Sequence, residues 1–174
     1  MKKYLITSKV GDLLHAQLST HKPDFALYRD KTNPNYETEA KNFIDICSKF
    51  QDIKPLIHQN IELAKQLKSY GVHLTSKQFD KIKEAKDAGL KVIVSTHSLE
   101  EIENAYKLQA DFVTYSPIFA SPNKGKPKGI DDLTKTVKQT NMKIFALGGI
   151  IDDAHIEKIK QSKAYGFASI RYFY

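Results

Sequence analysis

The sequence has few cysteines and no long apolar run, and each scarcity excludes a class of protein. Cys47 is the only cysteine in 174 residues, which rules out disulfides and cysteine-based zinc sites within the chain. A reducing compartment, the cytoplasm, is therefore expected. No apolar run reaches the roughly 18 residues of a membrane span, and the apolar stretch before Lys9 is too short for a secretory signal. We expect no membrane partner.

Negative charge is also in short supply, because the formal net charge is +7. A nucleic-acid-binding surface should gather its basic residues in one patch or motif. Here lysines such as Lys81 and Lys135 are spread over expected helix faces and alternate with acidic residues. This pattern indicates solvated helix surfaces and no nucleic-acid partner, although the charge favours anionic substrates through long-range attraction.

Short β-type runs alternate with amphipathic helical patterns along the whole chain, as in repeated βαβ units. The expected strands are Lys3–Thr7, Phe25–Arg29, Pro55–His58, Gly71–Leu74, Lys91–Ser95, Phe112–Ser116, Lys143–Leu147 and Tyr165–Ile170. The helical patterns that can be delimited are Tyr36–Phe50, Ile61–Leu67, Phe79–Ala88, Leu99–Leu108, Ile130–Lys138 and Ala154–Lys160.

Eight strands with seven intervening helices favour closure into a (β/α)₈ barrel over an open doubly wound sheet. We expect residues 1–174 to form one α/β domain, a TIM barrel truncated after the eighth strand because its final helix is missing. The outer faces of Tyr4, Ile6 and alternate residues from Phe167 onward would then need another cover. This predicts a homodimer with the Tyr172–Tyr174 tail at or near its interface; the alternative is that the tail folds back over its own chain.

In such a barrel the active site lies where the strands end. Alternation along the second strand and beyond puts Leu27, Arg29 and Lys31 on one face, so two cations point the same way. Gly148 and Gly149 follow the seventh strand, where bare backbone and a helix start can hold phosphate. The alternative is a turn that merely requires positive φ. The expected partner is a phosphorylated small molecule.

The order of these motifs resembles the thiamine-phosphate synthase superfamily, which includes the thiazole tautomerases. The resemblance runs from about Leu5 to Ile170, and its strongest elements are Leu27–Lys31, Gly71–Leu74, Ser95–Glu101, Ser116–Lys124 and Ala146–Ile150. It implies that Arg29, Lys31 and Ser95 serve a substrate diphosphate. It also implies that Gly148 and Gly149 hold the phosphate of a thiazole. The residues implied in the loop after the sixth strand are Ser121, Asn123 and the phosphate-binding Lys124.

The chain departs from the synthase pattern at the metal site. Synthases hold Mg²⁺ with two aspartates, and Gln59 and Gln78 stand at the matching positions; Leu27 replaces a glutamine. A neutral amide oxygen is a poorer Mg²⁺ ligand than a carboxylate. We therefore expect no metal and no cofactor, with Mg²⁺ needed only if the protein is a true synthase.

The tautomerases also lack those aspartates, but their catalytic base, a histidine, is Pro117 here. His58 and His97, at strand ends facing the expected site, are the candidate replacements, because a near-neutral pKa suits proton transfer. For both, a hydrogen-bonded scaffold role is the alternative. For His73, within a strand, we expect packing.

Three hypotheses follow for this chain. The first is a barrel of thiamin metabolism that binds thiazole phosphate or a related phosphoester, closer to the metal-independent tautomerases. The second is a true synthase, which joins a pyrimidine diphosphate to thiazole phosphate and releases diphosphate. The third is a non-catalytic barrel that binds a ligand of this pathway for sensing or regulation.

Overall fold

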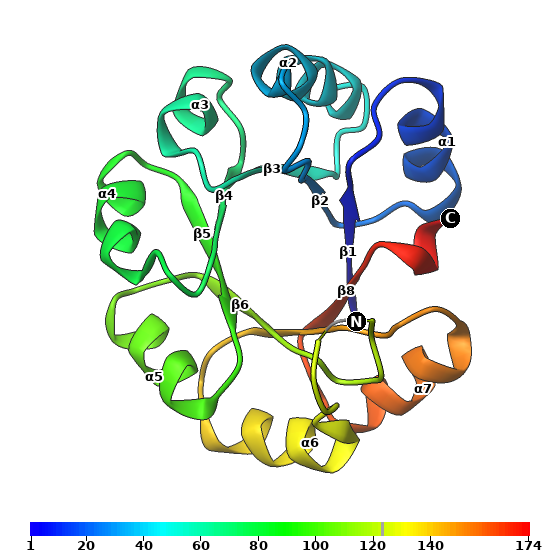
Figure 1. Ribbon diagram of the computed structural model, residues 1–174, viewed down its shortest axis with the longest axis vertical. Coiled ribbons are helices and arrows are strands. Elements are labelled where there is room, and N and C mark those ends of the chain that lie inside the picture. Colours follow the sequence, from blue (N-terminus) through cyan, green and yellow to red (C-terminus); the bar gives the residue numbers. More distant parts are fainter. Residues whose placement is uncertain (123) are drawn as a thin grey trace.

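The computed structural model describes residues 1–122 and 124–174. Eight parallel strands pair in chain order, and β8 pairs with β1, so that the sheet closes into a barrel (Figure 1). The strands are β1 Lys2–Thr7, β2 Phe25–Tyr28, β3 Lys54–His58, β4 Gly71–Leu74, β5 Lys91–Thr96, β6 Phe112–Tyr115, β7 Ile144–Leu147 and β8 Gly166–Ser169. The predicted α/β barrel is confirmed.

Within the described residues, seven α-helices lie outside the strands and surround the barrel (Figure 1). They are α1 Asp12–His21, α2 Tyr36–Cys47, α3 Ile61–Gln66, α4 Ile82–Asp87, α5 Leu99–Lys107, α6 Gly129–Gln139 and α7 Asp153–Gln161. The segment expected as one helix over Phe79–Ala88 divides into a short 3₁₀ helix, η1 Phe79–Lys81, and α4. None of these helices is long and apolar enough to cross a membrane.

Aromatic rings fill the half of the barrel interior that lies near the N-terminal ends of the strands. Phe25 packs against Phe112 and Phe145 with ring centroids 5.3 and 5.2 Å apart. The Lys54 and Lys143 ammonium groups lie over rings of this cluster, a favourable arrangement for a cation at an aromatic face. Lys54 begins β3 and Lys143 directly precedes β7, so the aromatic cluster occupies the N-terminal end of the barrel.

The inward and outward faces of β1 are opposite to the prediction. Tyr4 and Ile6 lie inside the barrel, within the aromatic cluster, and both are buried. Leu5 points outward and is buried with Leu14 and Leu18 of α1. All three strand residues are apolar or aromatic, so hydrophobicity alone could not distinguish the two faces.

The C-terminal tail folds back over the chain's own barrel, which was the alternative to its lying in a dimer interface. It forms a second 3₁₀ helix, η2 Arg171–Phe173, beside α1 (Figure 1). The Phe173 ring is buried and stacks on Phe167 at 5.9 Å, and the Gln17 side chain donates to the Phe173 carbonyl. The homodimer stays a prediction. Its interface would have to use side chains that remain exposed, such as Tyr174.

Candidate functional site

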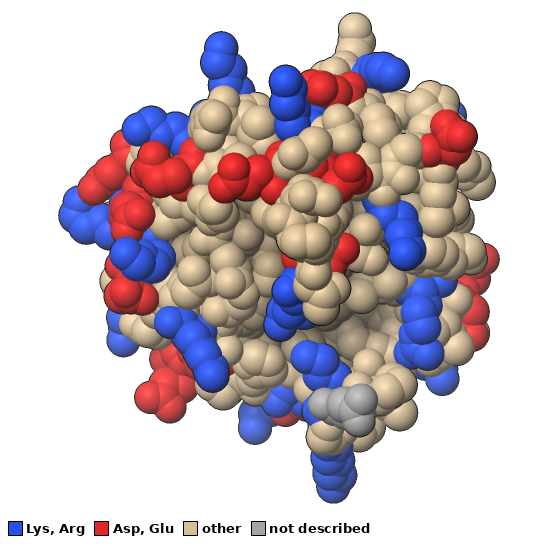
Figure 2. All heavy atoms as spheres, turned by 45° about the horizontal axis from the view of Figure 1, so that its top comes forward, with Lys and Arg blue, Asp and Glu red and all other residues tan. Residues whose placement is uncertain are grey.

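A cavity of about 420 Å³ opens at the C-terminal ends of the strands. Four of its lining residues are lysine or arginine, namely Arg29, Lys31, Lys124 and Arg171. No aspartate or glutamate is among the lining residues in the part of the chain that the structure describes. Basic side chains lie around the hollow visible on this face (Figure 2). The cavity is therefore suited to an anionic ligand.

The first two basic residues reach the cavity because the chain keeps its alternation beyond β2. The Arg29 backbone N–H donates to the Thr7 carbonyl at 2.8 Å, which extends the pairing with β1 by one step. Leu27, Arg29 and Lys31 all line the cavity. The structure thus brings these residues together as the alternation predicts, while their role in binding stays a prediction.

The loops after β6 and β7 form another wall, to which Ser121, Lys124, Gly148 and Gly149 contribute. Both glycines have positive φ, 101° and 71°. A Cβ atom on Gly149 would lie 2.5 Å from the Ala120 carbonyl oxygen. The turn and its packing are thus enough to require glycine, so the glycine pair alone does not identify a phosphate site. Asn123 lies outside the described residues.

His58 ends β3 and lies at the cavity, with only 9% of its surface exposed. Burial, reinforced by the charges of Arg29 and Lys31, lowers the pKa of His58 to about 4. The expectation of a near-neutral pKa is therefore wrong for this residue. Its imidazole is neutral at pH 7, and a base with so low a pKa is weak.

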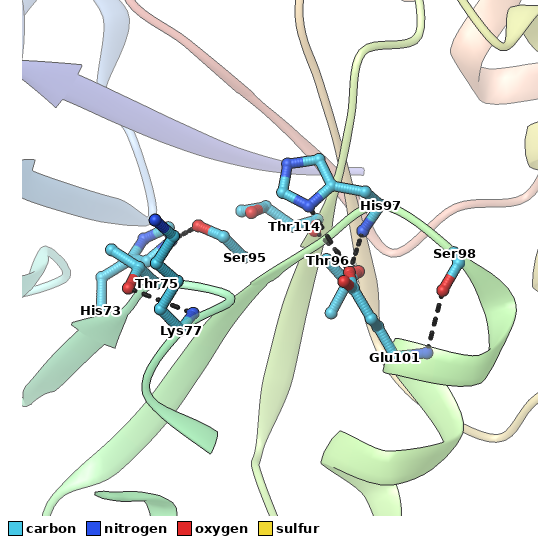
Figure 3. A network of polar contacts seen from close by, with 9 residues as sticks. All are labelled: His73, Thr75, Lys77, Ser95, Thr96, His97, Ser98, Glu101 and Thr114. Atoms are coloured by element: carbon cyan, nitrogen blue, oxygen red, sulfur yellow. Dashed lines mark hydrogen bonds and ion pairs between the residues drawn. The ribbon is translucent and has the colours of Figure 1, made fainter. Parts of the chain in front are cut away.

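His97 lies at the cavity rim just after β5, and about half of its side chain is exposed. Its Nδ1 is 3.4 Å from Glu101 Oε2, and its backbone N–H donates to the same oxygen. Ser98 caps α5 by accepting the Glu101 backbone N–H at 3.1 Å (Figure 3). Glu101 therefore holds His97 beside the start of α5, so the two candidate histidines occupy different environments.

His73 was expected to serve packing, but it also makes two side-chain hydrogen bonds. Its ring is 3% exposed. Nε2 lies 3.0 Å from Ser95 Oγ (Figure 3), and Nδ1 lies 2.7 Å from the Tyr4 hydroxyl. Sequence reasoning missed these hydrogen bonds because Tyr4 and His73 are 69 residues apart in the sequence, and His73 and Ser95 are 22 apart. The signal available was a histidine on the strand face that points into the barrel.

Sequence reasoning also passed over several hydroxyl groups that line the cavity. They are those of Thr75, Ser76, Ser116 and Ser169. Such side chains are common in loops and carry no distinctive spacing, so only the closed barrel shows that they converge. The hydroxyl protons of Thr75 and Ser169 are donated to Gln78 and to the Ile150 carbonyl, so Ser76 and Ser116 are the hydroxyls that can add donors to the cavity wall.

The residues present do not fit the Mg²⁺ site of a synthase. Gln59 is exposed, and the Gln78 side-chain oxygen accepts hydrogen bonds from the backbone and the hydroxyl of Thr75. Neither glutamine lines the cavity. Across residues 1–122 and 124–174, no three histidine, cysteine or acidic side chains lie together as a metal site. Mg²⁺ needs hard oxygen ligands, preferably charged.

Comparison with known proteins identifies the family. The model of the family described as thiamine monophosphate synthase matches residues 4–173. The chain belongs to the thiamine monophosphate synthase family. The resemblance inferred from the motifs is thereby confirmed.

Two curated members of this family illustrate the similarity. A thiamine-phosphate synthase of Prochlorococcus marinus is 34% identical over an alignment of 168 positions that covers 92% of this chain and 48% of the relative. One from Thermosynechococcus vestitus is 32% identical over an alignment of 178 positions that covers 98% of this chain and 50% of the relative. The chain thus spans about half the length of these synthases. Their activity comes to this chain only as a proposal.

A solved structure agrees with the barrel. The thiamine phosphate pyrophosphorylase of Pyrococcus furiosus superimposes with a TM-score of 0.82, covering 97% of this chain and 85% of that one. The sequence identity is 22%, so this similarity supports the fold alone.

Proposed function

We propose that the protein binds the phosphorylated substrates of thiamine-phosphate synthesis in the cavity at the C-terminal ends of the strands. The observation that carries the proposal is the charge of the cavity lining, which among the described residues holds four lysine and arginine side chains and no carboxylate. Anionic oxygens gain from such a lining without being repelled by it. Membership of the thiamine monophosphate synthase family supports the choice of substrate class.

The reaction we propose is condensation of a pyrimidine diphosphate with thiazole phosphate. The bond from the methylene carbon of the pyrimidine to a diphosphate oxygen breaks, and that carbon bonds to the thiazole nitrogen. Both electrons of the broken bond leave with the diphosphate, and no proton has to move. The protein's task is to hold the two substrates and to stabilise the negative charge that leaves.

This reaction suits the site better than a tautomerisation, which needs a base to take and return a proton. Pro117, at the position of the tautomerase base, has no side-chain proton acceptor. His58 is a weak base, since its pKa is about 4. The similarity to two thiamine-phosphate synthases also favours the synthase. The tautomerase-like activity first favoured therefore ranks second.

Basic side chains take the place of a metal in this account. Arg29 and Lys31 enter from the end of β2, and Lys124 from the loop after β6. Guanidinium and ammonium groups donate several hydrogen bonds to phosphate oxygens and carry the opposite charge. We propose that these three neutralise the phosphates of the bound substrates.

Incubation of the purified protein with a pyrimidine diphosphate and thiazole phosphate tests the proposal. Thiamine phosphate is measured by fluorescence after oxidation, in EDTA and, separately, with Mg²⁺. We expect the wild-type protein to form thiamine phosphate in EDTA. The Arg29→Ala variant should lose this activity, and the Lys81→Ala variant should keep it. Product only with Mg²⁺ would retain the reaction and contradict the metal-free account.

Binding without turnover is the outcome that distinguishes the non-catalytic hypothesis. Calorimetric titration with each substrate separates it from complete failure to bind. If neither substrate binds at millimolar concentration, the proposed function is wrong.

A further inference from the structure

A line of three hydrogen-bonding side chains runs from the filled end of the barrel to the cavity. Tyr4 is fully buried among the rings of the aromatic cluster. Its hydroxyl lies 2.7 Å from His73 Nδ1, and His73 Nε2 lies 3.0 Å from Ser95 Oγ. Ser95 lines the cavity, and its hydroxyl and the His73 ring point toward one another (Figure 3).

Two arrangements of protons are compatible with these distances. In the first, Tyr4 donates to Nδ1, the Nε2–H of His73 donates to Ser95, and the Ser95 proton is free for the cavity. In the second, Nδ1–H donates to Tyr4 and Ser95 donates its proton to Nε2, so the Ser95 oxygen can only accept a hydrogen bond from the cavity. A neutral imidazole carries one proton and can adopt only one arrangement at a time.

Burial of Tyr4 distinguishes the two arrangements. In the second, the phenolic proton would need another acceptor, and His73 is the only partner of this hydroxyl among the described residues. Leaving a buried donor unpaired is costly, whereas the first arrangement satisfies every group. The first arrangement is therefore the more stable in the free protein.

We propose that Tyr4 is a positioning residue that acts through His73 to make Ser95 a hydrogen-bond donor to the anionic oxygen of a ligand. The inference rests on the proposed function for the identity of the ligand, but the proton arrangement stands without it. The Ser95 hydroxyl then donates to the bound phosphate in addition to the basic side chains.

The neutral state of His73 agrees with this arrangement. Burial is the first cause that lowers the pKa of His73, to about 3, and the neighbouring His58 and Arg29 add to it. The ring therefore keeps a single proton across the neutral range, and its tautomer depends on its two partners.

Nitrogen-15 NMR of the wild-type protein labelled on histidine tests the arrangement directly. The chemical shift of a ring nitrogen distinguishes a protonated from an unprotonated site. We expect the proton of His73 on Nε2 between pH 6 and 8, with no ligand present. A proton on Nδ1 would overturn the inference, whatever the protein binds.

The matched variants are Tyr4→Phe and Tyr165→Phe. Both remove one hydroxyl from tyrosines at the filled end of the barrel, but only Tyr4 bonds to His73. In Tyr4→Phe we expect a shift of the His73 nitrogen signals toward a mixture of tautomers. We also expect the Kd for inorganic diphosphate to rise about threefold to tenfold, the usual range for one hydrogen bond. Tyr165→Phe should change neither.

The outcomes separate this inference from the proposed function. If wild-type protein binds diphosphate while Tyr4→Phe leaves both the tautomer and the Kd unchanged, the inference is wrong and the proposed function survives. If wild-type protein shows the Nε2 tautomer but binds no diphosphate, the proposed function fails and Ser95 is not a donor to an anion. Thermal unfolding of each variant confirms that it is folded before the comparison.

Discussion

Gly148 lies so close to Pro117 that a Cβ atom on the glycine would meet the Pro117 Cα at 2.8 Å. The loop after β7 is thus packed directly against the loop after β6. The backbone after β6 also donates hydrogen bonds to this segment, since the N–H of Phe119 donates to the Gly148 carbonyl at 3.0 Å. One wall of the cavity is therefore a single interlocked unit.

Gly148→Ala should destabilise the protein for two separate reasons. Positive φ costs an alanine about 1–2 kcal/mol, and overpacking against Pro117 adds about 1–3 kcal/mol. Gly89→Ala is the control, because Gly89 has a φ of 79° with nothing near its Cβ position. Urea unfolding measures both variants. Equal losses of unfolding free energy in the two variants would show that the cavity wall relaxes around the added methyl group without a further loss of stability.

Arg29→Ala and Lys124→Ala should each raise the Kd for diphosphate by at least about tenfold, because each removes a charged donor from the cavity. Lys81→Ala and Lys135→Ala are controls of the same charge change. Lys81 is paired with Glu84 at 2.9 Å, and Lys135 is exposed on α6. Calorimetry in low salt provides the measurement. Similar weakening in all four variants would mean that the charge acts diffusely and that the cavity is not the site.

Mg²⁺ should not bind to the free protein with submillimolar affinity, because the described lining offers it no carboxylate. Calorimetric titration with MgCl₂ checks this, with a Ca²⁺ titration as a comparison of a larger ion. Stoichiometric, submillimolar Mg²⁺ binding would contradict the account of the site and restore the metal-dependent synthase.

Stability should fall as the pH falls below about 6.5, partly because of His58. The unfolded imidazole takes up its proton near pH 6.5, but the folded one only near pH 4. Between these values the unfolded state binds more protons, so stability present above pH 6.5 is lost toward pH 4 at up to about 1.4 kcal/mol per pH unit.

His58→Gln should make this decline less steep, which unfolding in urea at pH 7.5, 6 and 5 would detect. His97→Gln is the matched control, because that ring is half-exposed at the rim. An unchanged pH dependence in His58→Gln would mean that the folded protein accommodates the charged imidazole.

Much of the fold could be predicted because strands and helices alternate with clear punctuation. Gly71–Leu74 was predicted with its observed bounds, and each of the other strands differs from its prediction by one residue at one end or, for β8, at both ends. α1 was expected without bounds, because Asp12–His21 has no marked apolar face. The inward face of β1 could not be predicted, since both faces of Tyr4-Leu5-Ile6 are apolar.

The candidate site was predictable where it depends on local alternation, as at Arg29 and Lys31. It was not predictable where it depends on partners distant in the sequence. The bonds of His73 to Tyr4 and Ser95 exist only because β4 faces β1 across the barrel and adjoins β5. A low pKa at His58 likewise follows from burial, which a residue type and its neighbours in sequence do not specify.

A crystal structure of the protein soaked in inorganic phosphate tests the central claim most directly. We predict density for the anion in the cavity, within hydrogen-bond distance of Lys124 or of the backbone at Gly148 and Gly149. Both glycines and Lys124 line the cavity. Density found only outside the cavity, on surface lysines, would contradict the assignment of a phosphate site to this barrel mouth.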